Sequence, residues 1–215
     1  MPTRLDLPPS VLEHGVVAVL RAAHADRYAP VVDVLAENGV HAIELTMSTP
    51  GTPDAVADLR ARIAGSGAAL GVGTVTDAET ATTVIDLGAE FVVTPTTETD
   101  VVRVAVDRGV PVYPGALSPT EVLAAWKAGA TAVKLFPAST VGPSYIGHLH
   151  GPFPQIPILP SGGFGIPDIP GWVRAGAVAV SMGSSLIGDA LSGGSLTDLA
   201  QRCRAAVDAV RKARS

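Results

Sequence analysis

A glycine followed by a short, mainly apolar stretch recurs five times along the chain. The copies lie at residues 39–44, 88–93, 109–114, 129–134 and 176–181. Glycine suits the position just past the end of a helix, because it adopts the left-handed conformation without steric cost. The apolar stretches are typical of strands that are buried on both faces. The pattern therefore predicts repeated units in which a helix ends and a buried strand begins.

Eight strand-and-helix units fit the whole sequence. Strands are predicted at residues 16–20, 40–45, 69–72, 90–93, 110–113, 130–136, 156–159 and 177–181. Helices are predicted at residues 8–14, 26–38, 53–64, 78–87, 99–108, 119–128, 144–149, 167–175 and 196–213. This alternation, without a hairpin signal, favours a (β/α)8 TIM barrel with a short N-terminal helix, in one domain over residues 1–215. An open doubly wound sheet is the alternative, but no glycine-rich dinucleotide-binding motif follows the first strand.

Composition narrows the class of protein. Hydrophobic residues make up 47% of the chain and charged residues 16%, so a sizeable core is expected and extensive disorder is not. A net charge of −5 argues against a nucleic-acid partner. Residues 135–167 carry no Asp, Glu, Lys or Arg, but seven prolines exclude a membrane span there. The single Cys203 excludes a disulfide framework, and the N-terminus lacks the apolar core of a signal peptide, so we expect a cytoplasmic protein.

Two charged residues stand inside the apolar strands. Glu44 and Lys134 each lie five residues after the glycine of their unit. Strands two and six face each other across an eight-stranded barrel, so the two side chains could meet inside it. Burial favours the neutral amine of a lysine, which makes Lys134 a candidate nucleophile toward a carbonyl. A buried ion pair with a purely structural role is the alternative.

The C-terminal ends of the strands are where barrel enzymes place their active sites. Candidate substrate-binding residues at these ends are Arg21, Thr74, Pro95, Phe136, Ser161, Gly162, Gly163, Gly183 and Ser184. The last five follow strands seven and eight, where small residues let backbone N–H groups approach a phosphate. His148 and His150 have no third ligand at a suitable spacing, so we expect no metal site.

Short motifs occur in a fixed order along the chain. They are residues 44–46 (Glu-Leu-Thr), 71–75 (Gly-Val-Gly-Thr-Val), 94–95 (Thr-Pro), 114–115 (Pro-Gly), 118–121 (Ser-Pro-Thr-Glu), 134–138 (Lys-Leu-Phe-Pro-Ala), 160–163 (Pro-Ser-Gly-Gly) and 183–184 (Gly-Ser). Together they resemble the 2-keto-3-deoxy-6-phosphogluconate and 2-keto-3-deoxy-6-phosphogalactonate aldolase family, over nearly the whole chain.

The resemblance implies a class I aldolase that cleaves a phosphorylated 2-keto-3-deoxy sugar acid to pyruvate and glyceraldehyde 3-phosphate. Lys134 would form the Schiff base, Glu44 would move protons, and Phe136 would form a wall of the site. The resemblance also implies a homotrimer, and neither a cofactor nor a metal.

One position departs from the family pattern. Many members carry an arginine two residues after the Glu-x-Thr motif, whereas this chain has Ser48. Galactonate-type relatives resemble this chain in lacking that arginine and in having one at the end of strand one, where Arg21 stands. A guanidinium there is suited to clamp the substrate carboxylate.

The sequence is also compatible with other activities. They are a related pyruvate aldolase acting on 4-hydroxy-2-oxoglutarate or on an unphosphorylated 2-keto acid, a phosphate-binding barrel with isomerase or thiamine-phosphate-type transferase chemistry, and a non-catalytic binding protein.

Overall fold

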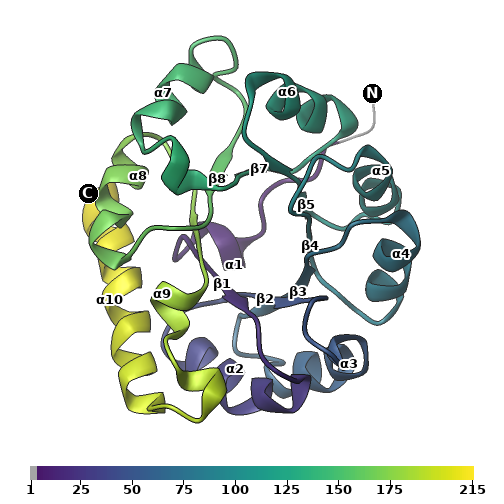
Figure 1. The fold of residues 1–215 in the computed structure, drawn as a ribbon, viewed down its shortest axis with the longest axis vertical. Coiled ribbons are helices and arrows are strands. Elements are labelled where there is room, and N and C mark those ends of the chain that lie inside the picture. The colour runs from purple at the N-terminus through teal and green to yellow at the C-terminus, as the bar shows by residue number, and fades with distance from the viewer. Residues whose placement is uncertain (1–3) are drawn as a thin grey trace.

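Parallel strands form a ring at the centre of the molecule, as the computed structural model of residues 4–215 shows (Figure 1). The strands are β1 (Val16–Leu20), β2 (Ala42–Thr46), β3 (Ala69–Gly73), β4 (Val92–Val93), β5 (Val112–Tyr113), β6 (Gly115–Ala116), β7 (Val133–Leu135), β8 (Ile158–Pro160) and β9 (Val180–Met182). Each pairs with its neighbours in parallel, in the orders β5-β4-β3-β2-β1-β9 and β6-β7-β8.

Two junctions close these sheets into one barrel. Between β5 and β6 stands only Pro114, which has no N–H to donate and so interrupts one continuous barrel strand. Its carbonyl still accepts a hydrogen bond from the Lys134 N–H of β7, at 2.9 Å. On the other side, Ser161, which directly follows β8, forms a parallel bridge to Ser181 of β9. Counting β5 and β6 as one strand gives eight, so the predicted (β/α)8 barrel is confirmed and the open sheet is wrong.

Helices surround the ring. They are α1 (Pro9–Leu12), α2 (Tyr28–Glu37), α3 (Thr52–Arg62), α4 (Ala78–Asp86), α5 (Thr99–Asp107), α6 (Pro119–Ala128), α7 (Ser144–His150), α8 (Ile169–Arg174), α9 (Ser184–Ile187) and α10 (Leu196–Arg214). Their starts follow the sequence: Asp77 caps α4, and Ser118 with Glu121 forms a capping box on α6. The four-residue helix α9 was not predicted, because a single turn is too short to show a helical period.

Side chains alternate between two cores along each strand. Residues that point outward pack against the helices, whereas those that point inward form a separate cluster inside the barrel. The inner cluster contains Val17 of β1, Ala42 of β2, Ala132 before β7 and Val11 of α1. Because Val11 belongs to it, α1 closes the N-terminal mouth of the barrel.

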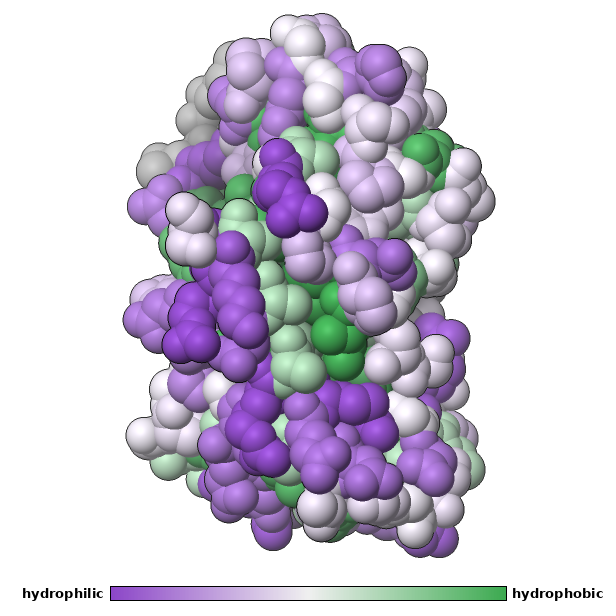
Figure 2. Space-filling model, turned by 90° about the vertical axis from the view of Figure 1, so that its left-hand side faces the viewer, coloured by the Kyte–Doolittle hydropathy of each residue, from purple (hydrophilic) through white to green (hydrophobic). Residues whose placement is uncertain are grey.

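The longest helix, α10, covers one side of the molecule and contacts α8 and α2. Its buried residues Leu199, Cys203, Ala206 and Val210 recur at helical spacing and form one stripe. Hydrophilic residues cover most of the outer side there, with a smaller group of hydrophobic residues near its centre (Figure 2). Within residues 4–215, no helix is both long and apolar enough to cross a membrane.

Candidate active site

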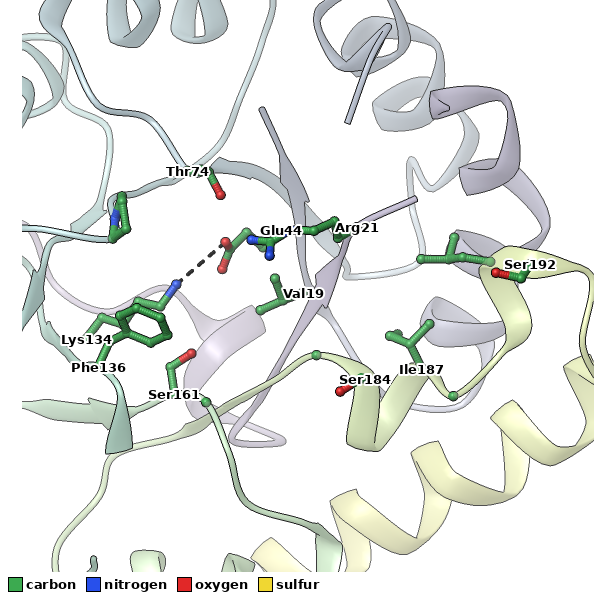
Figure 3. A pocket seen from close by; sticks show the side chains of 15 residues that line it. Val19, Arg21, Glu44, Thr74, Lys134, Phe136, Ser161, Ser184, Ile187 and Ser192 are labelled. Carbon is green, nitrogen blue, oxygen red and sulfur yellow. Dashed lines mark ion pairs between the residues drawn. The ribbon is translucent and has the colours of Figure 1, made fainter. Parts of the chain in front are cut away.

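A cavity of about 440 Å³ opens at the C-terminal ends of the strands, in the volume range of small-molecule sites. Figure 3 shows the side chains that surround it, which come from several strands and from the segment around α9. Its lining residues are Val19, Arg21, Glu44, Thr74, Pro95, Lys134, Phe136, Ser161, Gly162, Gly183, Ser184, Ile187, Gly188, Leu191 and Ser192.

Lys134 and Glu44 meet in this cavity from opposite sides of the barrel (Figure 3). The distance from Lys134 Nζ to Glu44 Oε1 is 3.7 Å, and their side chains are only 8% and 1% exposed. The two residues share the inward face with Ala132 and Ala42, two positions earlier on their strands. An amino group and a carboxyl group therefore lie side by side, and both side chains are almost fully buried.

Opposing influences act on the pKa of the Glu44 carboxyl group. Burial raises its pKa, and the positive charges of Lys134 and Arg21 oppose that rise. Its Oε2 atom is buried and has no hydrogen-bond partner among residues 4–215. One carboxyl oxygen thus faces the lysine, while the other is buried without a hydrogen-bond partner.

Gly73 and Thr74 make room for this carboxyl. A Cβ atom at Gly73 would overlap the Glu44 carboxylate, so only glycine fits there. Thr74 follows at a φ of 61°, and it is the only residue other than glycine with a positive φ within residues 4–215. Strained backbone of this kind concentrates at functional sites, and here it turns the chain at the edge of the cavity.

Arg21 lies at the end of β1, and hydroxyl groups of the next turn anchor the backbone on both sides of it. Thr46 Oγ1 donates to the Leu20 carbonyl at 2.9 Å, and the Ala22 N–H donates to Thr49 Oγ1 at 3.0 Å. The Ser48 hydroxyl donates to Thr46 at 3.3 Å and does not line the cavity. The turn after β2 therefore has no arginine of its own, and its hydroxyl groups hold the backbone around Arg21 in place.

The other predicted residues divide between the cavity and its margin. Pro95, Phe136, Ser161, Gly162, Gly183 and Ser184 line the cavity, whereas Gly163 lines an adjoining groove that shares Gly162, Gly183 and Ser184. The Ser161 hydroxyl also donates to Ser181 Oγ at 3.3 Å. Gly162 has a φ of 90°, and a Cβ there would come within 3.1 Å of the Phe136 ring.

Several residues that line the cavity were not predicted from the sequence. Val19 was detectable, because it lies two positions before Arg21 on the same inward face of β1. Ile187 is the last residue of α9, and Gly188, Leu191 and Ser192 follow it. No periodic pattern in the sequence predicts that this segment folds back over the strand ends. They give the cavity an apolar wall that the sequence did not suggest.

No metal ligands gather in this cavity within the described residues. His150 makes a 3.1 Å contact with the Ile156 carbonyl, and His148 is exposed on α7. A different group, Glu13, His14 and His41, comes together at the opposite end of the barrel. The sequence alone indicated no such group, because His41 is 27 residues from His14.

Comparison with known proteins yields consistent similarities. A family model described as KDPG and KHG aldolase matches residues 10–203. The probable 2-dehydro-3-deoxy-6-phosphogalactonate aldolase of Rhizobium meliloti (strain 1021) is 34% identical over 208 residues, covering 96% of this chain and 97% of its own. The 2-dehydro-3-deoxy-phosphogluconate aldolase of Haemophilus influenzae is 35% identical, covering 73% of this chain and 74% of its own. A solved native KDPGal structure superposes with a TM-score of 0.87 at 30% identity, covering 100% of this chain and 99% of that one.

Proposed function

The chain belongs to the KDPG and KHG aldolase family, and from this premise we propose that it is a class I aldolase that cleaves a 2-keto-3-deoxy-6-phospho sugar acid to pyruvate and glyceraldehyde 3-phosphate. The observation that carries the proposal is the buried Lys134–Glu44 pair in a cavity of suitable volume. A structural ion pair needs no cavity, whereas a nucleophile with an adjacent base does.

Lys134 begins the reaction as a nucleophile. Glu44, whose pKa is raised by burial, takes the ammonium proton across the short gap and leaves a neutral amine. The amine attacks the C2 carbonyl of the substrate to give a carbinolamine. Glu44 returns its proton to the departing hydroxyl group, so that water leaves, a protonated imine forms and the Glu44 carboxylate is restored. This imine accepts electrons from the adjacent C3–C4 bond.

Glu44 then acts as the base for carbon–carbon cleavage. Its carboxylate removes the proton of the C4 hydroxyl, the C3–C4 bond breaks, and its electron pair moves to form the enamine at Lys134. The aldehyde product leaves, a proton returns to C3, and hydrolysis of the imine releases pyruvate and the free lysine. Glu44 lines the cavity, so its carboxyl group borders the space that the substrate would occupy.

We assign the ends of the substrate by charge and by the space at the strand ends. Arg21 would hold the carboxylate, since it is the guanidinium that lines the cavity. Thr74, Pro95 and Phe136 would position the reacting carbons. The phosphate would lie against the small residues after β8 and β9, where Ser161, Gly162, Gly163, Gly183 and Ser184 border the cavity and its groove.

The galactonate epimer is the proposed preferred substrate. The Rhizobium relative named for it spans nearly the whole chain, whereas the relative named for the gluconate spans less. Arg21 with Ser48 also follows the galactonate pattern. Steady-state kinetics on both epimers test this assignment: a higher kcat/KM for the gluconate epimer would reverse it.

Borohydride reduction in the presence of pyruvate tests the chemistry itself. The sequence has two other lysines, Lys127 and Lys212, and both are exposed. We expect peptide mass mapping to find the reduced pyruvyl group on Lys134 alone, and labelling to vanish in Lys134→Met but to persist in Lys127→Met. Absence of labelling, or equal labelling of the exposed lysines, contradicts the Schiff-base mechanism.

We also propose that the enzyme is a cytoplasmic homotrimer. The family resemblance and the low fraction of charged residues, 16%, support the assembly, since apolar surface remains to be covered. The free, buried Cys203 suits a reducing compartment. Sedimentation equilibrium should give about three times the 21.8 kDa chain mass; a mass equal to one chain contradicts the trimer.

A further inference from the structure

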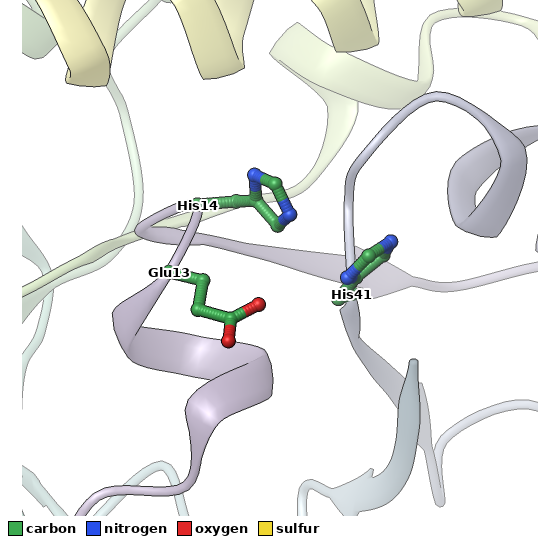
Figure 4. Close-up of side chains that lie close together, drawn as sticks. All are labelled: Glu13, His14 and His41. Atoms are coloured by element: carbon green, nitrogen blue, oxygen red, sulfur yellow. The ribbon is translucent and has the colours of Figure 1, made fainter. Parts of the chain in front are cut away.

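We propose that Glu13, His14 and His41 form a binding site for a divalent transition-metal ion such as Zn²⁺ at the N-terminal end of the barrel. Figure 4 shows the three side chains, which come from the end of the α1 segment and from the residue before β2. The two rings are in edge-on contact, with centroids 4.5 Å apart. One ligand atom from each residue lies within 4.8 Å of the others.

The donor set selects the class of ion. Two imidazole nitrogens and one carboxylate oxygen suit Zn²⁺, Ni²⁺, Co²⁺ or Cu²⁺, whereas Mg²⁺ and Ca²⁺ prefer oxygen ligands alone. Three protein ligands leave the fourth position of a tetrahedral ion to water. In such a site the ligand atoms lie about 3.3 Å apart, so the distance between any two of them must shrink by at most about 1.5 Å.

The surroundings permit this movement. Glu13 is exposed, and both histidines are half-buried, so their side chains are not locked by packing. Glycines border both rings: a Cβ at Gly67 would lie 3.6 Å from His41 Nδ1, and one at Gly39 would lie 3.8 Å from His14 Nδ1.

The position of the site suggests what the ion does. Glu13 and His14 connect α1 to β1, while His41 directly precedes β2. A bound ion would tie the helix that closes the barrel mouth to a central strand. Strands of five residues separate this site from the reaction cavity, a distance of roughly 16 Å, so the ion acts on stability and not on the aldol reaction.

Calorimetric titration of the chelator-treated, desalted protein with Zn²⁺ tests the proposal. We expect one ion per chain, a Zn²⁺-dependent rise in melting temperature, and no such rise with Mg²⁺. Loss of a group that only orients a ligand costs about ten- to a hundredfold in affinity, so loss of the ligand itself in His41→Gln should lower Zn²⁺ affinity at least about a hundredfold. Glu13→Gln should lower it by a smaller factor, because the amide keeps a neutral oxygen ligand. His148→Ala removes an exposed histidine outside the cluster and should leave binding unchanged.

Two further measurements guard against trivial outcomes. Circular dichroism of metal-free His41→Gln should match the metal-free parent, so that lost binding reflects a lost ligand and not misfolding. Chelation should leave kcat/KM unchanged in the parent, which separates this proposal from the catalytic one. Three results would overturn the site. The first is the absence of saturable Zn²⁺ binding, and the second is binding that His148→Ala weakens as much as His41→Gln does. The third is an unfolded His41→Gln together with intact binding in Glu13→Gln and His14→Gln.

Discussion

At the N-terminal end of the strands, α1 lies across the barrel and Val11 packs into its interior; at the C-terminal end, the strands lead into loops that surround a cavity of about 440 Å³. The inward-facing side chains of the same strands reach both ends of the barrel. Ala42 and Ala132 belong to the apolar interior, and two residues later the same rows carry Glu44 and Lys134.

The two layers of inward-facing side chains, two residues apart along each strand, serve different purposes: the lower layer stabilises the fold and the upper layer carries the proposed reaction. Apolar side chains in the lower layer exclude water without polar groups that need partners. Charged side chains in the upper layer lose hydration, which destabilises the fold and raises the pKa of Glu44. Substitutions at the two ends should therefore affect different measurements.

The largest effect is expected at Lys134. Lys134→Met keeps a similar volume but cannot form an imine, so kcat/KM should fall by roughly 10⁴-fold or more. Thermal melting should show that the variant still folds, because the unpaired Glu44 carboxyl can take up a proton and stay neutral. The exposed Lys127→Met is the control, and a Lys134→Met enzyme with substantial aldol cleavage would exclude the proposed nucleophile.

Arg21→Ala should have the next largest effect. Losing a charge-assisted contact with the substrate carboxylate should cost roughly 2 to 4 kcal/mol in kcat/KM, with phosphorylated and unphosphorylated substrates alike. Ser48→Ala should cost less than about 1 kcal/mol, because the hydroxyl contacts only Thr46. Ser184→Ala should matter only for phosphorylated substrates. Near-parent kinetics of Arg21→Ala on both substrates would assign the carboxylate to other groups.

Gly73→Ala probes the space behind Glu44. The added methyl overlaps the carboxylate, so Glu44 must move and kcat should fall by about a hundredfold. Gly147→Ala in α7 is the matched control, because its added methyl meets nothing within 4 Å. Equal activity of the two variants would show that the position of Glu44 is not critical.

Val11→Ala tests the opposite end. It removes buried volume from the barrel interior, so the free energy of unfolding should fall by about 2 kcal/mol while kcat/KM stays unchanged. The neighbouring Leu12 is 44% exposed, and Leu12→Ala should change stability by less than about 0.5 kcal/mol. Urea unfolding and steady-state kinetics measure both quantities. A large loss of activity in Val11→Ala would show that the two ends are coupled.

The smallest effect is a shift in pH dependence. Burial raises the pKa of Glu44, so the carboxylate needed for proton transfer forms only above the ordinary glutamate range, and activity should decline on the acid side from a higher pH than about 4.3. Arg21 lowers this pKa, so the acid limb of Arg21→Ala should move to still higher pH. The free energy of unfolding depends on pH in the opposite sense. The stabilisation linked to the raised pKa of Glu44 is fully present below about pH 4.3 and is lost as the pH rises and Glu44 ionises. An acid limb that moves down in Arg21→Ala contradicts this assignment.

The sequence by itself determined the barrel and the two central residues. Its repeated glycine-and-strand units predicted eight strands, because buried parallel strands are uniformly apolar and helix ends need glycine at positive φ, as at Gly39 and Gly129. Glu44 and Lys134 were detectable because charges inside such strands are rare, and their matching positions predicted that they face each other. The family motifs added the candidate residues around them.

Tertiary structure alone decided which distant groups meet. The wall from Ile187 to Ser192 begins at the last residue of α9, a single helical turn, and no period in so short a segment shows where the chain folds back. The anchoring of Arg21 by Thr46 and Thr49 depends on the path of a turn. Glu13, His14 and His41 come together because α1 closes the barrel beside the start of β2. Sequence periodicity reports which face of an element is buried, whereas such contacts depend on the distances between elements once the barrel has closed.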